Sequence, residues 1–384
     1  MRIQSIDILR GIAILGILFM NIYYHGFFTA GYVELMPKPP SDTAIEIINA
    51  VFFDGRFRTL FCLLFGAGLA IQYKSCKKKQ ISAKFFLTAR MKWLMGFGLL
   101  HGIFIFGGDI LLLYGICALT ILSSLALPLK CLYKKAIKFL SIGITITIAL
   151  TVLFVFVIEE PTVIRNSDEY REMYTLWFSG YGYQILQQGG TALALVLLSP
   201  ISAYWQLAGL MLLGAFLYRV GFFKKGFTNA QLIKVALAAV ILTGIETTLM
   251  LTVPAIDSVI SSEMANVSAI FVALLYAHIV VRVVNNQHSF IKLFAAPGKL
   301  ALSLYIFQSI TMAVLLRIWN QDFHLTAHRL DYVLIALVFT VLQIGLAHWY
   351  LRYFSQGPLE YIWRKAYWRS FTKAQTSLPE GQQV

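Results

Sequence analysis

The sequence predicts an all-α membrane protein: a polytopic helix bundle with about ten transmembrane helices and both termini in the cytoplasm. Apolar runs alternate with short charged segments, and the composition is 58% hydrophobic and 13% charged, with a mean hydropathy of +0.71. Soluble domains have a much more polar balance. The net charge of +14 therefore favours the lipid bilayer as partner, and no soluble basic domain exists to bind nucleic acid.

Ten apolar runs carry the prediction of the fold. Most of them reach the roughly 20 residues that a helix needs to cross about 30 Å of hydrocarbon, although the third is short. The first run is too long for a cleaved signal peptide, so we expect it in the mature protein. The runs lie at 6–28, 52–73, 92–107, 110–128, 138–158, 191–217, 233–253, 265–284, 299–317 and 331–352.

The charges between the runs predict the orientation. With Met1 placed in the cytoplasm, the inner segments hold 25 of the 32 Lys and Arg residues, and the outer segments hold 14 of the 18 acids. Short loops rich in Lys and Arg resist translocation. We therefore expect a multi-pass protein of the bacterial cytoplasmic (inner) membrane.

The domain organisation follows from the same pattern. We expect an N-terminal helical half (1–158), an outer loop (159–190), a C-terminal helical half (191–353), and an interfacial helix with a polar tail (354–384). The loop is rich in Tyr and Gln, which suits either a cap over a cavity or an interfacial aromatic belt. The four cysteines show no metal-binding spacing, so we expect neither a metal nor a disulfide framework.

Ionisable side chains at membrane depth cost at least about 2.5 kcal/mol, so they are usually paired, cavity-lining or functional. Asp7 and Arg10 are three residues apart, a spacing that predicts a structural ion pair at the inner end of the first helix. Asn21 and His25 lie close to the same helix face, nearer its outer end. We expect these two to contact substrate, unless the stripe only anchors the helix.

The second span begins with three charged residues, Asp54, Arg56 and Arg58. An arginine at this depth can hold a carboxylate, a phosphate or a developing oxyanion. Snorkelling to the interface explains Arg56 equally well, but Arg58 less so.

His101 lies about 14 Å beyond the inner basic edge at Lys92, near the bilayer centre. Gly98 and Gly102 allow a neighbouring helix to pack closely against its face. Asp109 follows on a very short outer turn, so we expect it to share an outward-opening cavity with the charged residues of the second span. His101 is then either a packing residue or a general base.

Two further polar groups interrupt apolar runs. Trp205 and Gln206 follow a break at Pro200, while Tyr305 and Gln308 share one helix face. Both groups could bind substrate in a cavity or only form hydrogen bonds between helices. Glu246 stands alone in its span and suggests no role.

These residues resemble a known family in order and spacing. The bacterial YeiB family is similar in Asp7-x-x-Arg10-Gly, Asn21, Thr59-Leu60-Phe61, His101-Gly102, Gly108-Asp109, Trp205-Gln206, Gln308 and Gly357-Pro358-Leu-Glu360. The resemblance covers nearly the whole chain. The family's C-terminal half is a domain of unknown function, and its N-terminal half resembles the heparan-alpha-glucosaminide N-acetyltransferase group of the transmembrane acyltransferase superfamily.

That resemblance implies a transmembrane-acyltransferase-like fold and transfer of an acyl group from cytoplasmic acyl-CoA or acetyl-CoA to a polar, glycan or lipid acceptor at the outer face. The essential histidine of the acetyltransferase group lies between the first two spans, where residues 29–51 of this chain contain none. The base is then His101 or His25, within a central cavity shared by the first, second, third, fourth, sixth and ninth spans.

The hypothesis assigns His101 as general base, Asp109 or Asp54 as its orienting carboxylate, and Arg58 or Arg56 as the oxyanion-stabilising group. Trp205, Gln206, Tyr305 and Gln308 would contact substrate. The alternatives are a transporter or lipid-handling protein that uses the same cavity without chemistry, and a non-catalytic membrane partner. A homodimer is compatible with either.

Overall fold

The structure, a computed structural model, describes residues 3–157, 163–252 and 257–376, and every regular element in these ranges is helical. All ten apolar runs fall on helices, which confirms the all-α class. The elements are α1 (Gln4–Gly26), α2 (Pro40–Phe52), α3 (Arg56–Lys78), α4 (Ala83–Phe104), α5 (Leu111–Ile121), η1 (Leu122–Ala126), α6 (Leu129–Val157), α7 (Asp168–Phe178), α8 (Tyr181–Leu198), η2 (Ser199–Ile201), α9 (Tyr204–Arg219), α10 (Phe222–Lys225), α11 (Asn229–Thr252), α12 (Asp257–Asn285), η4 (Phe290–Phe294), α13 (Ala295–Lys299), α14 (Ala301–Ala313), η5 (Val314–Trp319), α15 (Phe323–Thr326), α16 (Arg329–Tyr353) and α17 (Pro358–Thr376).

Within these ranges, six helices are long and apolar enough to cross a membrane: α1, α6, α11, α12, α14 with η5, and α16. A seventh crossing is possible if α8 and α9, which meet at an angle of 74°, form one broken span. The break contains Pro200, as the sequence suggested, because proline cannot continue the hydrogen bonding of a helix. The chain is therefore a multi-pass membrane protein, while the number of ten spans remains a prediction.

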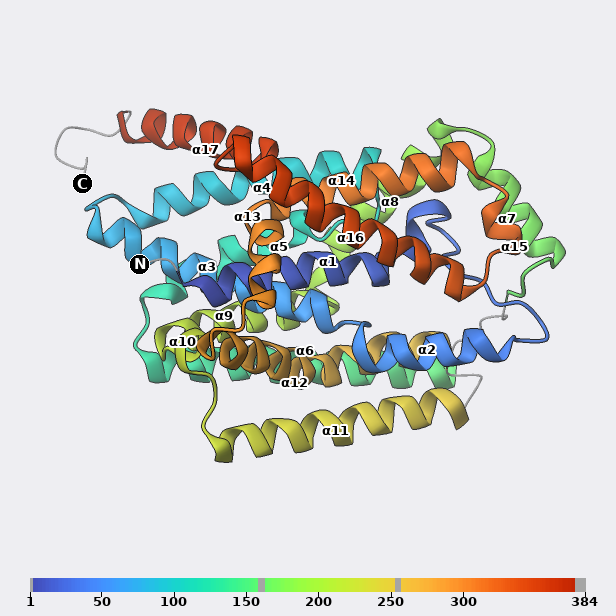
Figure 1. Cartoon of the computed structure of the whole chain (residues 1–384), viewed down its shortest axis with the longest axis horizontal. Helices are drawn as coiled ribbons and strands as arrows, with labels where there is room; N and C mark the ends of the chain where they lie inside the picture. Colours follow the sequence, from blue (N-terminus) through green and yellow to red (C-terminus); the bar gives the residue numbers. More distant parts are fainter. Residues whose placement is uncertain (1–2, 158–162, 253–256, 377–384) are drawn as a thin grey trace.

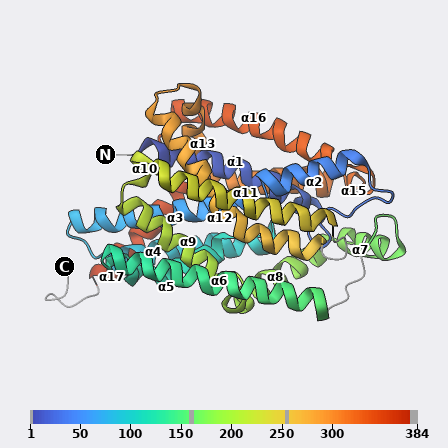
Figure 2. The same cartoon turned by 90° about the horizontal axis from the view of Figure 1, so that it is seen from below.

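Helix α1 forms the centre of the bundle (Figure 1). In its apolar window 78% of the residues are buried, against 17% in α11, which runs along the lower edge of the molecule in Figure 1 and across its near face in Figure 2. Helices α3 and α9 pack closely against each other at glycine residues. A Cβ on Gly66 would lie 1.9 Å from the carbonyl oxygen of Met211. Gly214 meets the Leu63 carbonyl in the same way. Small residues are what allow membrane helices to approach this closely.

Helix α17 packs against α4 at the end of the molecule where α1 begins (Figure 1). Trp363 and Tyr367 of the expected interfacial helix are buried, and Trp363 Nε1 donates a hydrogen bond to the Arg90 carbonyl at 3.0 Å. Glu360 accepts hydrogen bonds from the first amides of α14, at 2.8 Å from Leu302 N and 3.1 Å from Ser303 N. Its carboxylate thus satisfies backbone groups that a helix start leaves free. The polar tail expected from residue 372 is helical up to Thr376, and residues 377–384 lie outside the described ranges.

The expectation of an outer loop at 159–190 is wrong for its described part. Residues 168–178 form α7, and α8 begins at Tyr181. Ser167 caps α7 by accepting a hydrogen bond from Tyr170 N at 3.1 Å. Tyr170 and Trp177 are buried against Phe27, at the end of α1. An aromatic segment that looked like a loop is thus a helical cap with a small core of its own.

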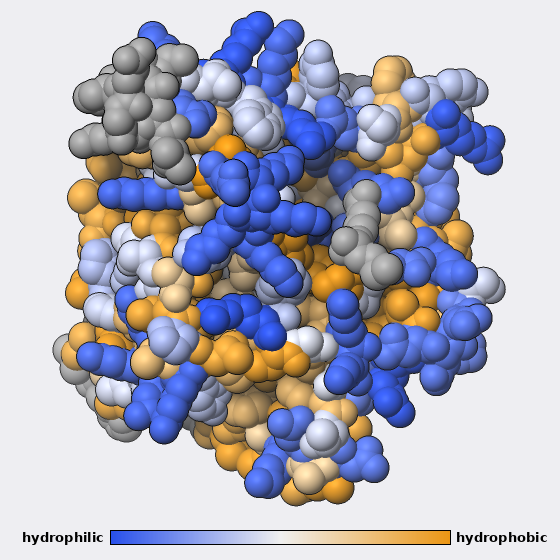
Figure 3. All heavy atoms as spheres, turned by 90° about the vertical axis from the view of Figure 1, so that its left-hand side faces the viewer, coloured by the Kyte–Doolittle hydropathy of each residue, from blue (hydrophilic) through white to orange (hydrophobic). Residues whose placement is uncertain are grey.

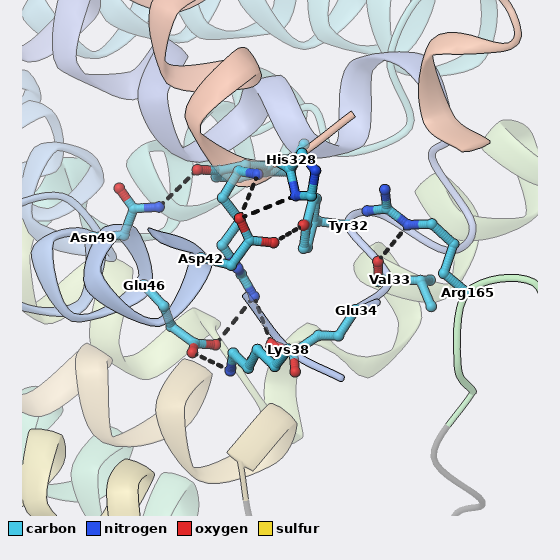
Figure 4. A network of polar contacts seen from close by, with 11 residues as sticks. Tyr32, Val33, Glu34, Lys38, Asp42, Glu46, Asn49, Arg165 and His328 are labelled. Carbon is cyan, nitrogen blue, oxygen red and sulfur yellow. Dashed lines mark hydrogen bonds and ion pairs between the residues drawn. The ribbon is translucent and has the colours of Figure 1, made fainter. Parts of the chain in front are cut away.

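A network of ion pairs fastens α2 to the start of α16 beside this cap (Figure 4). Lys38 Nζ lies 2.7 Å from Glu34 and 2.5 Å from Glu46, and Arg329 pairs with the same two carboxylates at 3.2 and 3.0 Å. Tyr32 hydrogen-bonds to Asp42. Because each of these charges has an opposite partner, we interpret the network as structural.

Candidate active site

His101 and Asp109 form a buried pair. His101 lies near the end of α4 and Asp109 in the turn before α5; their side chains are 2% and 3% exposed, and His101 Nδ1 is 2.8 Å from Asp109 Oδ1. The second carboxylate oxygen accepts a hydrogen bond from Leu112 N at 3.0 Å, and the Tyr305 hydroxyl lies 3.5 Å from Oδ1. Because a carboxylate only accepts, the imidazole carries its proton on Nδ1, and Nε2 keeps a free lone pair.

Gly98 permits this pair to form. A Cβ at this position would lie 2.3 Å from Leu112 N and 2.8 Å from Asp109 Oδ2. Gly102, one turn later, meets Asp109 Cβ at 3.5 Å and Ala192 of α8 at 3.8 Å. The predicted close approach at these two glycines is therefore made by the start of α5 and by α8.

A cavity of about 230 Å³ lies beside the pair, and its lining includes Arg10 near the start of α1, Glu360 near the start of α17, and Ile110 next to Asp109. Figure 3 faces the end of the molecule where α1 begins, and hydrophilic side chains surround a recessed apolar area there. The walls come from α1, α3, α4, the start of α5, α13, α14 and α17, and most are apolar. Tyr305 lies at the far end of the cavity, with its ring centroid 5.0 Å from that of His101.

Basic groups gather where the cavity opens. Arg10, Arg90 and Lys299 line it, together with Glu360. The Arg90 guanidinium stacks on the Trp363 ring at 3.8 Å, which fixes its position. This end corresponds to the side that the charge pattern assigns to the cytoplasm, so a negatively charged ligand would enter between cations.

Three of the residues expected around His101, namely Asp54, Arg56 and Arg58, have other partners. Arg56 is fully buried and pairs with Glu246 at 2.8 and 3.1 Å. It also donates to the carbonyl of Asp54. Arg58 hydrogen-bonds to the Asn266 side chain. None of the polar contacts found among the described residues joins the side chains of Asp54, Arg56 or Arg58 to His101 or Asp109.

Among the described residues, Arg56 and Arg58 find their partners on α11 and α12 instead, so these contacts do not join the two arginines to Asp109 as the sequence predicted. Glu246, for which the sequence suggested no role, is the counterion of Arg56. It also accepts a hydrogen bond from Ser268. Because the two charges neutralise each other, both can be buried, and removing one of them would be strongly unfavourable.

Trp205 and Gln206 lie outside the cavity. Trp205 Nε1 donates to the Pro200 carbonyl at 2.9 Å, and Gln206 Nε2 to the Asn266 carbonyl at 2.6 Å. Their hydrogen bonds re-satisfy backbone at the break and join helices, which favours the structural interpretation.

The remaining candidates are Gln308, Asn21 and His25. Gln308 donates to the Ile14 carbonyl at 3.1 Å and to Gln343 at 2.8 Å, so it links three helices. Asn21 is half-buried. His25 is 1% exposed and its Nδ1 has no hydrogen-bond partner, as is true of His101 Nε2. Both rings pack on Phe106, with centroids 4.2 and 6.3 Å away.

Asp7 and Arg10 do pair, at 3.5 Å, while Arg10 also lines the cavity. Within the described ranges no group of three His, Cys, Asp or Glu side chains is placed to hold a metal ion. Arg90 and Arg317 were not singled out from sequence. The signal for Arg317 was present, since it is the one charged residue near the outer end of the ninth apolar run.

The comparisons with known proteins agree with the sequence-based resemblance. Residues 217–370 match a family described as "Protein of unknown function (DUF418)". The chain is 27% identical to the uncharacterized protein YeiB of Escherichia coli over 95% of this chain and 96% of that protein. It is 23% identical to the uncharacterized protein YxaH of Bacillus subtilis, with 96% and 95% covered. The chain is thus similar to YeiB and YxaH over nearly its whole length, and its C-terminal half matches the DUF418 family model.

Proposed function

We propose that the protein is a membrane acyltransferase, which moves an acyl group from acyl-CoA at the cytoplasmic face to an acceptor at the outer face. One observation carries the proposal: a cavity with mostly apolar walls is lined by three cations and by Tyr305, whose ring lies beside a buried His–Asp pair with no partner for His101 Nε2. A histidine oriented by a carboxylate is the arrangement that general-base catalysis requires.

The donor's parts match the cavity's chemistry. Its phosphates would bind Arg10, Arg90 and Lys299 at the opening, because guanidinium groups form strong charge-assisted hydrogen bonds to phosphate. The thin pantetheine arm and acyl group would then extend along the apolar walls. The volume is below the usual 300–1,000 Å³ of small-molecule sites, which suits a chain better than a ring system.

The reaction needs one proton transfer to His101 and one from it. The acceptor's hydroxyl or amine gives its proton to His101 Nε2 and attacks the thioester carbonyl carbon. The carbon–sulfur bond breaks, and the coenzyme A thiolate takes that proton as it leaves. Asp109 would stabilise the imidazolium formed in between, and the Tyr305 hydroxyl, 3.5 Å from Asp109 Oδ1, would turn to donate to the developing oxyanion.

Turnover by the purified protein tests the proposal. The protein in nanodiscs would be incubated with acetyl-CoA labelled in its acetyl group, with an extract of the bacterial envelope as the source of acceptor. We expect label in a product free of coenzyme A, and a loss of about 10²–10⁴-fold in His101→Asn.

His288→Asn is the matched control, because His288 is exposed and does not line the cavity. It should retain full activity. Unchanged turnover in His101→Asn would refute the assignment of the base, and an absence of any labelled product would favour the carrier alternative.

A further inference from the structure

Arg317 is a buried cation that the proposed transfer chemistry does not use. It lies in η5, a π-helical turn at the end of α14, and is 5% exposed. Its Nε donates to the His25 carbonyl at 2.6 Å and its Nη1 to Gln188 Oε1 at 3.3 Å. The guanidinium lies over the Trp177 ring at 5.3 Å. Single π-helical turns occur frequently at functional sites.

No carboxylate neutralises this arginine. Among the described residues, no Asp or Glu lies within ion-pair distance of Arg317, and Nη2 has no hydrogen-bond partner. Arg56 shows the contrast in the same molecule: it is equally buried, but both its terminal nitrogens reach Glu246. A buried charge without an opposite charge is strongly unfavourable, so the guanidinium is set up to receive an anion.

Two imidazole nitrogens share this region. His25 Nδ1 and His101 Nε2 have no partner, and the rings pack on either side of Phe106. The His25 carbonyl itself accepts the hydrogen bond from Arg317. Two imidazoles without a partner for one ring nitrogen thus pack on one phenylalanine, and Arg317 is joined to His25 near the end of α1.

We propose that Arg317 and His25 form a binding site for an oxyanion, a carboxylate or a phosphate. Arg317 supplies the charge and a free N–H, and Gln188 fixes its orientation. If the protein is the transferase proposed above, on which this step rests, the oxyanion belongs to the acceptor. An anion held here would place the acceptor on the His101 side of Tyr305, while the donor arrives from the other side.

Thermal unfolding tests the anion site without requiring turnover. The purified protein in nanodiscs of neutral phosphatidylcholine would be titrated with inorganic phosphate or acetate at constant ionic strength, with chloride as the reference salt. We expect a saturable rise in Tm with phosphate or acetate. Arg317→Gln should lose that rise, and Arg329→Gln, whose arginine is already paired with Glu34 and Glu46, should keep it.

A second set of nanodiscs distinguishes the source of the anion. A rise only in discs that contain phosphatidylglycerol, lost in Arg317→Gln, assigns the site to a lipid headgroup; a rise with free phosphate or acetate assigns it to a soluble acceptor. If Arg317→Gln does not fold, Arg317→Lys and His25→Ala replace it, with a weakened rise expected in both.

The proposal is overturned if no probe raises the Tm of the wild type, or if the rise survives in Arg317→Gln. The two proposals fail separately. Anion binding without acyl transfer retains the site and rejects the transferase, whereas transfer without anion binding does the reverse.

Discussion

At the scale of single residues, the tautomer of His101 is the feature on which the chemistry depends. Asp109 accepts a hydrogen bond from Nδ1–H of the neutral imidazole and thereby leaves Nε2 as the basic nitrogen. In Asp109→Asn the amide can donate to Nδ1 instead, which moves the ring proton to Nε2. We expect kcat to fall by about 10²–10⁴-fold with little change in KM for acyl-CoA, measured as product formation. Asp322→Asn, a change at an exposed contact, should leave kcat and KM unchanged. Equal losses of kcat in Asp109→Asn and Asp322→Asn would argue against a catalytic role of the His101–Asp109 pair.

Arg90 is the residue-scale test of the donor site. Its guanidinium lines the opening of the cavity and is held by Trp363. Arg90→Gln should raise KM for acetyl-CoA about tenfold or more, since one charge-assisted contact to phosphate is worth roughly 1.5–3 kcal/mol. Acetyl-pantetheine, which lacks the nucleotide phosphates, should be used equally well by the variant and the wild type. A similar loss with both donors would place the defect elsewhere.

The polar residues show what sequence can predict at this scale. His101 and Asp109 lie eight residues apart on adjoining segments, so their meeting followed from local geometry. The partners of Arg56 and Arg58 could not be found in this way, because Glu246 and Asn266 are about 200 residues away and depend on how α11 and α12 pack.

At the scale of elements, the outer cap has a built-in pH dependence. His324 in α15 is buried; its Nε2 donates to the Leu316 carbonyl at 3.2 Å, and its Nδ1 accepts from the Tyr332 hydroxyl at 2.8 Å. Burial lowers the pKa of His324 from 6.5 to about 4. Between these values the unfolded chain binds more protons than the folded protein, so stability falls as pH decreases from 6.5 toward 4.

The lowered pKa of His324 reduces the free energy of unfolding by roughly 3 kcal/mol once the pH has fallen to about 4. Unfolding temperatures measured from pH 7.5 to 4.5 should therefore fall less steeply in His324→Gln than in the wild type, even if the variant is less stable at neutral pH. An equal fall of Tm with pH in His324→Gln and the wild type would show that His324 is not responsible for the pH dependence.

Gly66 tests how α3 and α9 pack. Since its Cβ would collide with the Met211 carbonyl oxygen, Gly66→Ala should separate the helices and lower the free energy of unfolding by about 1–3 kcal/mol. Gly96→Ala is the control, because a Cβ there has nothing within 4 Å. Denaturation in detergent measures both, and equal effects would contradict the packing described.

Hydrophobic runs predicted the helices well because each run is one continuous apolar segment, a pattern that is visible within a short stretch of sequence. They predicted the outer segment poorly. The stretch from Asp168 to Gln188 is too polar to be recognised as membrane helix, and its helices are stabilised by burying Tyr170 and Trp177 under the end of α1. That contact between distant parts of the chain leaves no periodic signal.

At the scale of the whole molecule, the charge pattern predicts which end faces the cytoplasm. Cysteines introduced at Lys78 and Glu169, both exposed, should differ in labelling by an impermeant thiol reagent applied to intact cells. Replacing the exposed Cys131 with serine removes the accessible native thiol. We expect labelling at position 169 and none at 78, and the reverse result would invert the orientation.

The most direct test of acyl transfer across the bilayer uses the sidedness of sealed vesicles. Acetyl-CoA labelled in its acetyl group would be added outside inside-out and right-side-out membrane vesicles that contain the protein. If the cavity opens to the cytoplasm and His101 is the base, only inside-out vesicles should use external donor, labelled product should accumulate in their lumen, and His101→Asn should form none. Equal labelling in both orientations, or full labelling with His101→Asn, would contradict the account.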